Sequence, residues 1–204
     1  MTKSKNLNNY SSKNIKFGGE YLWQTFEYFA KKGKVCIQKQ HVSRRFNREI
    51  CNFANRIYPN ENNITTSMDT RTEHDGVYLI HRKDVKKYVQ YFHPAVLRWS
   101  VSTNTDGFDS INYGACKGQT YDRVLIYPTG KLLDFLLKGK ELSSKNKYYV
   151  AVTRPRYSIA IVIDSFPKKW NTYMYTHETI ALDDNSIDSW HLKPDSKFDA
   201  VDNE

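Results

Sequence analysis

Three short segments of the sequence carry residues suited to binding anions. Arg154 precedes a proline and an apolar run, and Arg45 opens a stretch with helical periodicity. The arginine guanidinium is planar, stays charged and can contact two oxygens of one ligand at once. Lys117 and Gly118 stand before a second apolar run, where the glycine lets the backbone approach a ligand closely and the lysine supplies charge. Taken singly, each segment also fits a simpler interpretation: an arginine on the solvent side of a helix, or a turn before a core strand.

The positive charge of the chain is concentrated in its first part. Residues 1–177 hold 29 lysines and arginines against 14 acidic residues, whereas residues 178–204 hold 2 against 8, so a body of charge +15 precedes a segment of charge −6. A basic body is compatible with a polyanionic partner, because binding to phosphates releases counterions and gives affinity without sequence reading. A solvated, lysine-rich surface explains the same charge equally well. Charge therefore permits nucleic-acid binding without establishing it.

Composition and cysteine spacing exclude several classes of protein. The chain has 204 residues, of which 39% are hydrophobic and 26% charged, which is the composition of a globular protein with a proper core. Cys36, Cys51 and Cys116 have no second cysteine or histidine at a metal-ligand interval, so neither a zinc site nor a disulfide framework is indicated. Residues 1–12 lack the apolar core of a signal peptide, and no run of about 18 apolar residues could span a membrane. We expect a soluble, cytoplasmic protein without a metal site or a membrane partner.

The periodicity of apolar residues predicts alternating helices and strands. Helices are expected over residues 20–32, 46–57 and 83–91, and another is expected to begin at Ser143 or Ser144. Strands are expected at residues 35–37, 76–81, 96–101, 110–113, 123–127 and 159–163. The last two are continuous apolar runs, typical of strands covered on both faces. The pattern predicts an α/β fold with a parallel sheet and flanking helices, and an acidic end from residue 168 that is a small appendage or a tail.

Three segments resemble motifs from the C-terminal half of UvrD/Rep-type superfamily 1 DNA helicases. They run from Ser43 to Asn55, from Gly114 to Thr129 and from Lys147 to Ala160, in the family's order. The first, SRRFNREICNFAN, is similar to the family's N-Y-R-S/F stretch. The second, GACKGQTYDRVLIYPT, is similar to motif V, and the third, KYYVAVTRPRYSIA, to motif VI, usually written Y-V-A-x-T-R-A-R. The resemblance implies the second RecA-like lobe of a helicase, with the sheet of a P-loop NTPase.

The resemblance also implies nucleotide chemistry for four residues. Arg154 matches the arginine finger that closes over the triphosphate, and Arg45 the arginine that reaches the γ-phosphate; such fingers contribute roughly 10³ to 10⁵ in rate. Gly118 and Thr120 match positions that face the nucleotide, although many relatives have a glutamate where Thr120 stands. Pro155 replaces the family's alanine. Because proline inside a helix costs about 3 kcal/mol, it either ends the helix at Arg154 or tilts the arginine away from its working position.

DNA contacts are implied for Cys116 and Lys117 of the same motif V, with single-stranded DNA as the partner. Cys116 replaces the usual serine of the family. Two further departures lie nearby in the motifs: Gly114 stands where many relatives have a histidine, and Arg44 where they have a tyrosine.

The phosphate-binding loop G-x-x-x-x-G-K-[ST] is absent from the sequence. Three Gly-Lys pairs occur, at Gly33, Gly130 and Gly139, but none has the upstream glycine or the following serine or threonine. The similarity begins near residue 15, which in full-length relatives lies just after motif III. We therefore expect a split, truncated or internally started helicase gene, with residues 1–14 as a flexible segment, 15–165 as the lobe and 166–204 as the acidic appendage.

Two functions remain open from the sequence. In one, the chain supplies arginines to an ATP site that a separate N-terminal lobe completes, so that ATP and Mg²⁺ bind only to the assembled pair. In the other, the chain is a non-catalytic remnant or a basic module that binds nucleic acid or protein. The missing phosphate-binding loop and the departure at Pro155 motivate the second possibility.

Overall fold

The computed structural model describes residues 22–38, 40–59, 64–169, 171, 173–183 and 185–193. The chain divides into two compact units between Gln40 and His41. The first unit contains one described helix, α1 (Leu22–Lys31), which confirms the helix expected over 20–32. The strand expected at 35–37 is wrong, because these residues have no regular structure and Val35 is exposed. The expected boundaries of the lobe, 15–165, stay a prediction.

The second unit is built on a seven-stranded, mostly parallel sheet with the order β5-β4-β6-β7-β3-β9-β8. Its parallel strands are β3 (Gly76–His81), β4 (Ala95–Arg98), β5 (Ile111–Asn112), β6 (Tyr121–Ile126) and β7 (Pro155–Ile163). A separate two-stranded parallel sheet joins β1 (Val42–Ser43) to β2 (Thr65–Thr66). The fold class expected from the sequence, an α/β parallel sheet with flanking helices, is confirmed.

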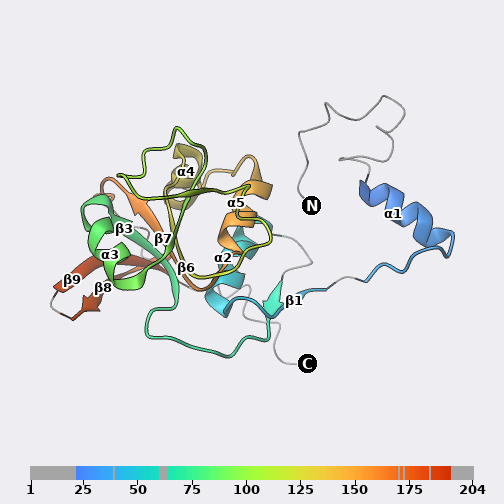
Figure 1. Cartoon of the computed structure of the whole chain (residues 1–204), viewed down its shortest axis with the longest axis horizontal. Helices are drawn as coiled ribbons and strands as arrows, with labels where there is room; N and C mark the ends of the chain where they lie inside the picture. The colour runs from blue at the N-terminus through green and yellow to red at the C-terminus, as the bar shows by residue number, and fades with distance from the viewer. Residues whose placement is uncertain are drawn as a thin grey trace. The chain divides into compact units, whose positions relative to one another are not determined.

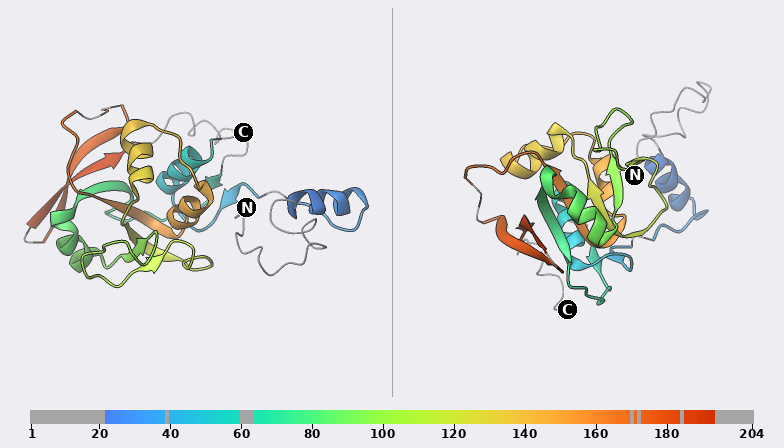
Figure 2. Two further views of the ribbon diagram at one scale, coloured as in Figure 1. Left: turned by 90° about the horizontal axis from the view of Figure 1, so that it is seen from above. Right: turned by 60° about the vertical axis from the view of Figure 1, so that its left-hand side comes forward.

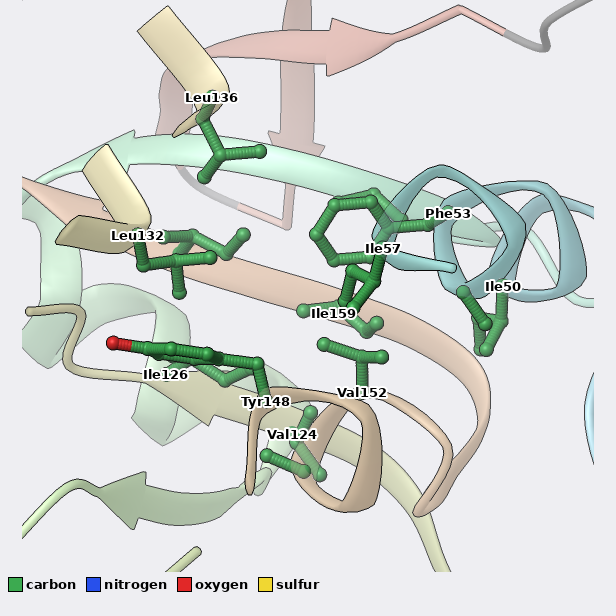
Figure 3. Close-up of a cluster of buried hydrophobic side chains, with 14 of the residues drawn as sticks. Ile50, Phe53, Ile57, Val124, Ile126, Leu132, Leu136, Tyr148, Val152 and Ile159 are labelled. Carbon is green, nitrogen blue, oxygen red and sulfur yellow. The ribbon is translucent and has the colours of Figure 1, made fainter. Parts of the chain in front are cut away.

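Helices cover both faces of the large sheet (Figures 1 and 2). One face packs against α2 (Arg48–Ile57), α4 (Gly130–Lys138) and α5 (Lys145–Val152). The other packs against the short 3-10 helix η4 (Arg82–Asp84) and α3 (Val85–Phe92), with Val85 and Tyr88 buried. Consecutive residues of β6 and β7 enter opposite cores, which confirms that these apolar runs are covered on both faces. Figure 3 shows the larger core, in which side chains of α2, α4 and α5 converge over β6 and β7.

Two strands from the acidic end of the chain belong to the sheet. Strands β8 (Tyr175–Leu182) and β9 (Asn185–Leu192) form an antiparallel hairpin, and β9 pairs antiparallel with β3. Figure 1 shows this hairpin at the edge of the sheet, beside β3. Ile180 and Ile187 enter the core on the α3 side, while Tyr175 and Leu192 enter the other. An appendage was expected here, and the structure shows that it extends the sheet itself. Residues 194–204 lie outside the described residues.

Pro155 lies outside the preceding helix, because it opens strand β7. Helix α5 stops at Val152, Thr153 caps it, and β7 begins at Pro155. The backbone amide of Tyr121 donates to the carbonyl of Arg154, so β6 and β7 are joined at this point. Of the two consequences expected for the proline, termination of the helix before it fits the structure. The N-cap expected at Ser143 or Ser144 is Ser144, although its side chain makes no capping hydrogen bond.

Candidate anion-binding site

Arg45 and Arg154, the two arginines singled out from the sequence, come together in the structure. Arg45 precedes the first turn of α2, and Arg154 lies between the end of α5 and the start of β7. A guanidinium nitrogen of Arg45 donates to the backbone carbonyl of Thr153 at 3.4 Å, and a guanidinium nitrogen of Arg154 donates to the Thr153 hydroxyl at 3.3 Å. Thr153 therefore accepts hydrogen bonds from both arginines, which are 109 positions apart in the sequence.

The guanidinium of Arg154 is held by three neutral acceptors. Besides the Thr153 hydroxyl, it donates through Nε to the carbonyl of Val150 at 3.0 Å and through a terminal nitrogen to the carbonyl of Gln119 at 3.2 Å. The first contact fixes the arginine on α5, and the last ties it to the loop before β6. The orientation of Arg154 therefore depends on two separate segments of the chain.

No carboxylate of the described residues compensates the charge of the arginine pair. Arg45 and Arg154 are both partly buried, and neither forms an ion pair with a carboxylate of the described residues. The pKa of Arg154 lies below its ordinary value, first because burial penalises the charged form and next because the positive charge of Arg45 repels it. Two like charges in a partly desolvated position are unfavourable unless an anion joins them. The arrangement is therefore suited to an oxyanion such as a phosphate group, which two guanidinium groups can bind through several oxygens.

Asn47 fixes the segment that carries Arg45 to the strand that follows Arg154. Its side-chain oxygen accepts from the amide of Ile50 and caps α2, while its side-chain nitrogen donates to the carbonyl of Tyr157 at 2.7 Å. Its own backbone amide donates to the carbonyl of Arg156 at 3.0 Å. Asn47 is almost completely buried, at 1% exposure. The sequence analysis missed Asn47 and Thr153 as positioning residues, although an asparagine immediately before a helical period is a recognisable N-cap signal.

The loop of motif V, residues 114–120, lies between β5 and β6 and is exposed except at Cys116. Gly118 adopts a φ of +88°, in the region that favours glycine, which explains this residue at the turn. Gln119 reaches Arg154 through its backbone carbonyl, so the loop and the arginine are in direct contact. Lys117 and Thr120 have exposed side chains. Among the described residues, neither Gly118 nor Thr120 forms a hydrogen bond with the arginines. Their expected nucleotide contacts stay predictions.

The side chain of Cys116 lies in the core, whereas the resemblance implied a DNA-facing position. Its side chain is fully buried, and its thiol donates to the backbone carbonyl of Tyr113 at 3.0 Å. Burial, the largest effect, raises the pKa of the thiol, while Arg154 opposes it. The turn directs this small side chain into the core. Of the two residues implied to face DNA, Lys117 alone presents its side chain to solvent.

Among the described residues, no group of three or more histidine, cysteine or acidic side chains could hold a metal ion. Likewise, none of the described helices is both long enough and apolar enough to cross a membrane.

No family model matches the sequence, and no curated protein matches it either. Solved structures of the PRRSV helicase resemble part of the chain. One has a TM-score of 0.40 at 20% sequence identity and covers 76% of this chain but 31% of its own. A second, of PRRSV nsp10, has a TM-score of 0.37 at 21% identity and covers 59% of this chain and 23% of its own. The chain thus spans less than a third of these helicases, and the assignment of its site rests on its own side chains.

Proposed function

We propose that this chain acts as the second RecA-like lobe of an ATP-dependent helicase or translocase of the UvrD/Rep type. In this proposal Arg45 and Arg154 contact the terminal phosphates of an ATP molecule held by a first lobe. The observation that carries the proposal is the uncompensated arginine pair, in which both groups hydrogen bond to neutral acceptors. The match of both arginines to the family's motifs supports it.

The arginines act on charge that develops during phosphoryl transfer. The transferred group spreads negative charge over its oxygens, and guanidinium groups fixed beside them stabilise that charge. Arg154 is positioned from α5 and from the loop before β6, while Arg45 is positioned from the N-terminus of α2. Mg²⁺ and the phosphate-binding loop would come from the first lobe. The chain's own contribution is therefore orientation and electrostatic stabilisation.

The loop 114–120 supplies the connection to nucleic acid in this proposal. Lys117 is exposed on the loop, and Gln119, two residues later, holds Arg154 through its carbonyl. Contact between Lys117 and a phosphodiester backbone would shift the same short turn that orients the arginine. Single-stranded DNA is the partner that the family resemblance favours, and ATP-driven movement in the 3′ to 5′ direction is the activity it implies.

The proposal is tested by reconstituting ATP hydrolysis. The purified chain is mixed with a first RecA-like lobe encoded in a neighbouring reading frame, and hydrolysis is measured with and without single-stranded DNA. We expect activity only in the mixture, stimulated by DNA, and a loss of at least about a hundredfold in the Arg154→Gln variant. Lys138→Gln is the matched control, because it removes one positive charge from the exposed side of α4. Equal activity of wild type and Arg154→Gln would overturn the proposal.

A non-catalytic binding module is the second candidate. It is favoured by one observation: three donors of the Arg154 guanidinium are already used by the chain itself. Such a module binds single strands with steep salt dependence, since phosphate contacts dominate its affinity. Salt-dependent DNA binding without hydrolysis in any mixture would favour this candidate over the motor lobe.

A further inference from the structure

Strand β8 forms one edge of the seven-stranded sheet, and within the described part of the chain no strand pairs with its outer side (Figure 1). Its eight residues pair with β9 along their whole length and in a single register. The opposite edge of the sheet is the two-residue strand β5. A long, regular edge strand is a template for another strand, whereas a very short one is protected by its length. A further strand would therefore add to this sheet at β8.

The backbone groups of alternate residues in β8 point away from β9. The amide of Lys193 donates to the carbonyl of Met174 at 2.8 Å, so in the antiparallel register the even-numbered residues of β8 are those that bond to β9. The N–H and C=O groups of His177, Thr179 and Ala181 therefore point outwards. All three residues are exposed, which leaves their backbone groups accessible to a second strand.

Strand β8 lacks the usual features that protect an edge strand from pairing. Its sequence, YTHETIAL, contains no lysine, arginine, proline or glycine. The carboxylate of Glu178 lies 3.4 Å from Nδ1 of His191 on β9. The ring of His177 packs against that of Trp190, also on β9, with 5.2 Å between the ring centroids. Both side chains lie over the neighbouring strand, so they leave the outer side of β8 without a charge that would repel another strand.

We infer that β8 pairs antiparallel with β8 of a second copy of this chain, across a twofold axis at Thr179. Such an axis is perpendicular to the sheet, so two paired residues lie on the same face and are both odd-numbered or both even-numbered. An axis at Glu178 would place two carboxylates opposite each other, which is unfavourable. Axes at His177 or Ile180 would leave fewer residues paired. The axis at Thr179 gives the longest overlap without opposing like charges.

The charges at the two ends of β8 favour a second copy as the partner. Lys168 and Lys169 are exposed in the segment before β8, and Asp183 is exposed directly after it. Antiparallel pairing brings the segment before β8 of one copy towards the turn after β8 of the other. Opposite charges therefore approach each other at both ends of the paired strands, which favours this orientation. The inference does not depend on the proposed function, because the arginine pair takes no part in the pairing.

Sedimentation velocity of the full chain over a wide range of concentration measures the pairing. We expect the wild type to show a reversible equilibrium between monomer and dimer. Thr179→Pro removes an N–H group that points away from β9, so the β8–β9 hairpin keeps its own hydrogen bonds. Because both copies lose this donor, the dissociation constant of the dimer should rise at least about tenfold. Circular dichroism and urea denaturation should show that the variant is folded as the wild type is.

Opposite charges at the axis give a second, sharper test. Thr179→Lys places two ammonium groups opposite each other, and Thr179→Glu places two carboxylates there, so the dissociation constant of each variant alone should rise about fivefold. An equal mixture of the two variants should restore a dimer, because each lysine then meets a glutamate. Thr176→Lys is the matched control, since it adds the same charge at an exposed position that lies opposite Leu182 of the second copy. It should remain dimeric.

Three results would overturn the inference. A wild type that stays monomeric at every concentration would exclude a second copy, and a strand of another protein would be the remaining partner for this edge. A dimer that is unaffected by Thr179→Pro and by both charged variants would place the interface elsewhere. If Thr176→Lys dissociated as readily as Thr179→Lys, the repulsion would follow net charge, and the axis at Thr179 would be wrong.

Discussion

Replacing Gly76 with alanine should destabilise the protein strongly, because two separate costs arise at this position. Gly76 begins β3 with a φ of +125°, and a Cβ atom there would lie 2.2 Å from Nε2 of His191 on β9. A non-glycine residue in such a backbone conformation costs about 1–3 kcal/mol, and overpacking adds typically about 1–3 kcal/mol. The free energy of unfolding should therefore fall by about 2–6 kcal/mol.

Urea denaturation followed by circular dichroism measures this change. Gly114→Ala is the control, because its Cβ would meet nothing within 4 Å and its φ is not positive. It should stay within about 0.5 kcal/mol of wild type. A double-mutant cycle with His191→Ala isolates the overlap, since the backbone cost remains when the ring is gone. If Gly76→Ala were as stable as Gly114→Ala, the placement of the acidic hairpin against β3 would be wrong.

Two further changes test the buried polar groups. Asn47→Ala removes the cap of α2 and leaves the carbonyl of Tyr157 without its side-chain donor. The free energy of unfolding, measured by urea denaturation, should therefore fall by about 2–4 kcal/mol. A loss under about 0.5 kcal/mol would refute the anchoring role of Asn47. His74 has its pKa lowered to about 3, mainly by burial and then by the charge of Arg123, so the folded state holds it neutral. The contribution of His74 to the free energy of unfolding is complete above its unfolded pKa of about 6.5. It is lost as the pH falls from there towards 3, by up to about 1.4 kcal/mol per pH unit. His74→Phe should flatten the stability profile between pH 6.5 and 5, and an unchanged slope would contradict this assignment.

The parts of the fold that the sequence predicted are those with strong apolar periodicity. Strand β3 matches its expected range, and β6 and β7 contain theirs or nearly so, because a strand buried on both faces needs a continuous apolar run. Helix α4 was missed, although Thr129 caps it and Gly139 ends it with a φ of 64°. The hairpin of β8 and β9 could not be predicted from the sequence. Most of β8 is exposed, and only its two buried positions hold residues that indicate a strand packed on a core. Long-range pairing with β3 supplies the rest of its stability.

The candidate site shows a similar division between local and long-range information. The motifs pointed to Arg45 and Arg154, and the structure brings both to Thr153. That both arginines reach Thr153 could not be predicted from their spacing, since it depends on the packing of α2 against α5. The direction of the Cys116 side chain could not be predicted from the sequence either, because a single turn decides whether a small residue faces solvent or the core.

The most direct test of the central claim is equilibrium binding of inorganic triphosphate to the wild type, Arg45→Gln, Arg154→Gln and the double variant. Hydrogen bonds to charged groups contribute about 1.5–3 kcal/mol, so each single variant should bind at least about tenfold more weakly. Because both guanidinium groups would contact one ligand, the two losses should not be additive. Lys138→Gln should bind as wild type does at equal ionic strength, since its charge lies on the exposed side of α4. If Lys138→Gln weakened binding as much as Arg154→Gln did, affinity would follow net charge alone, and the arginine pair would not be a phosphate site.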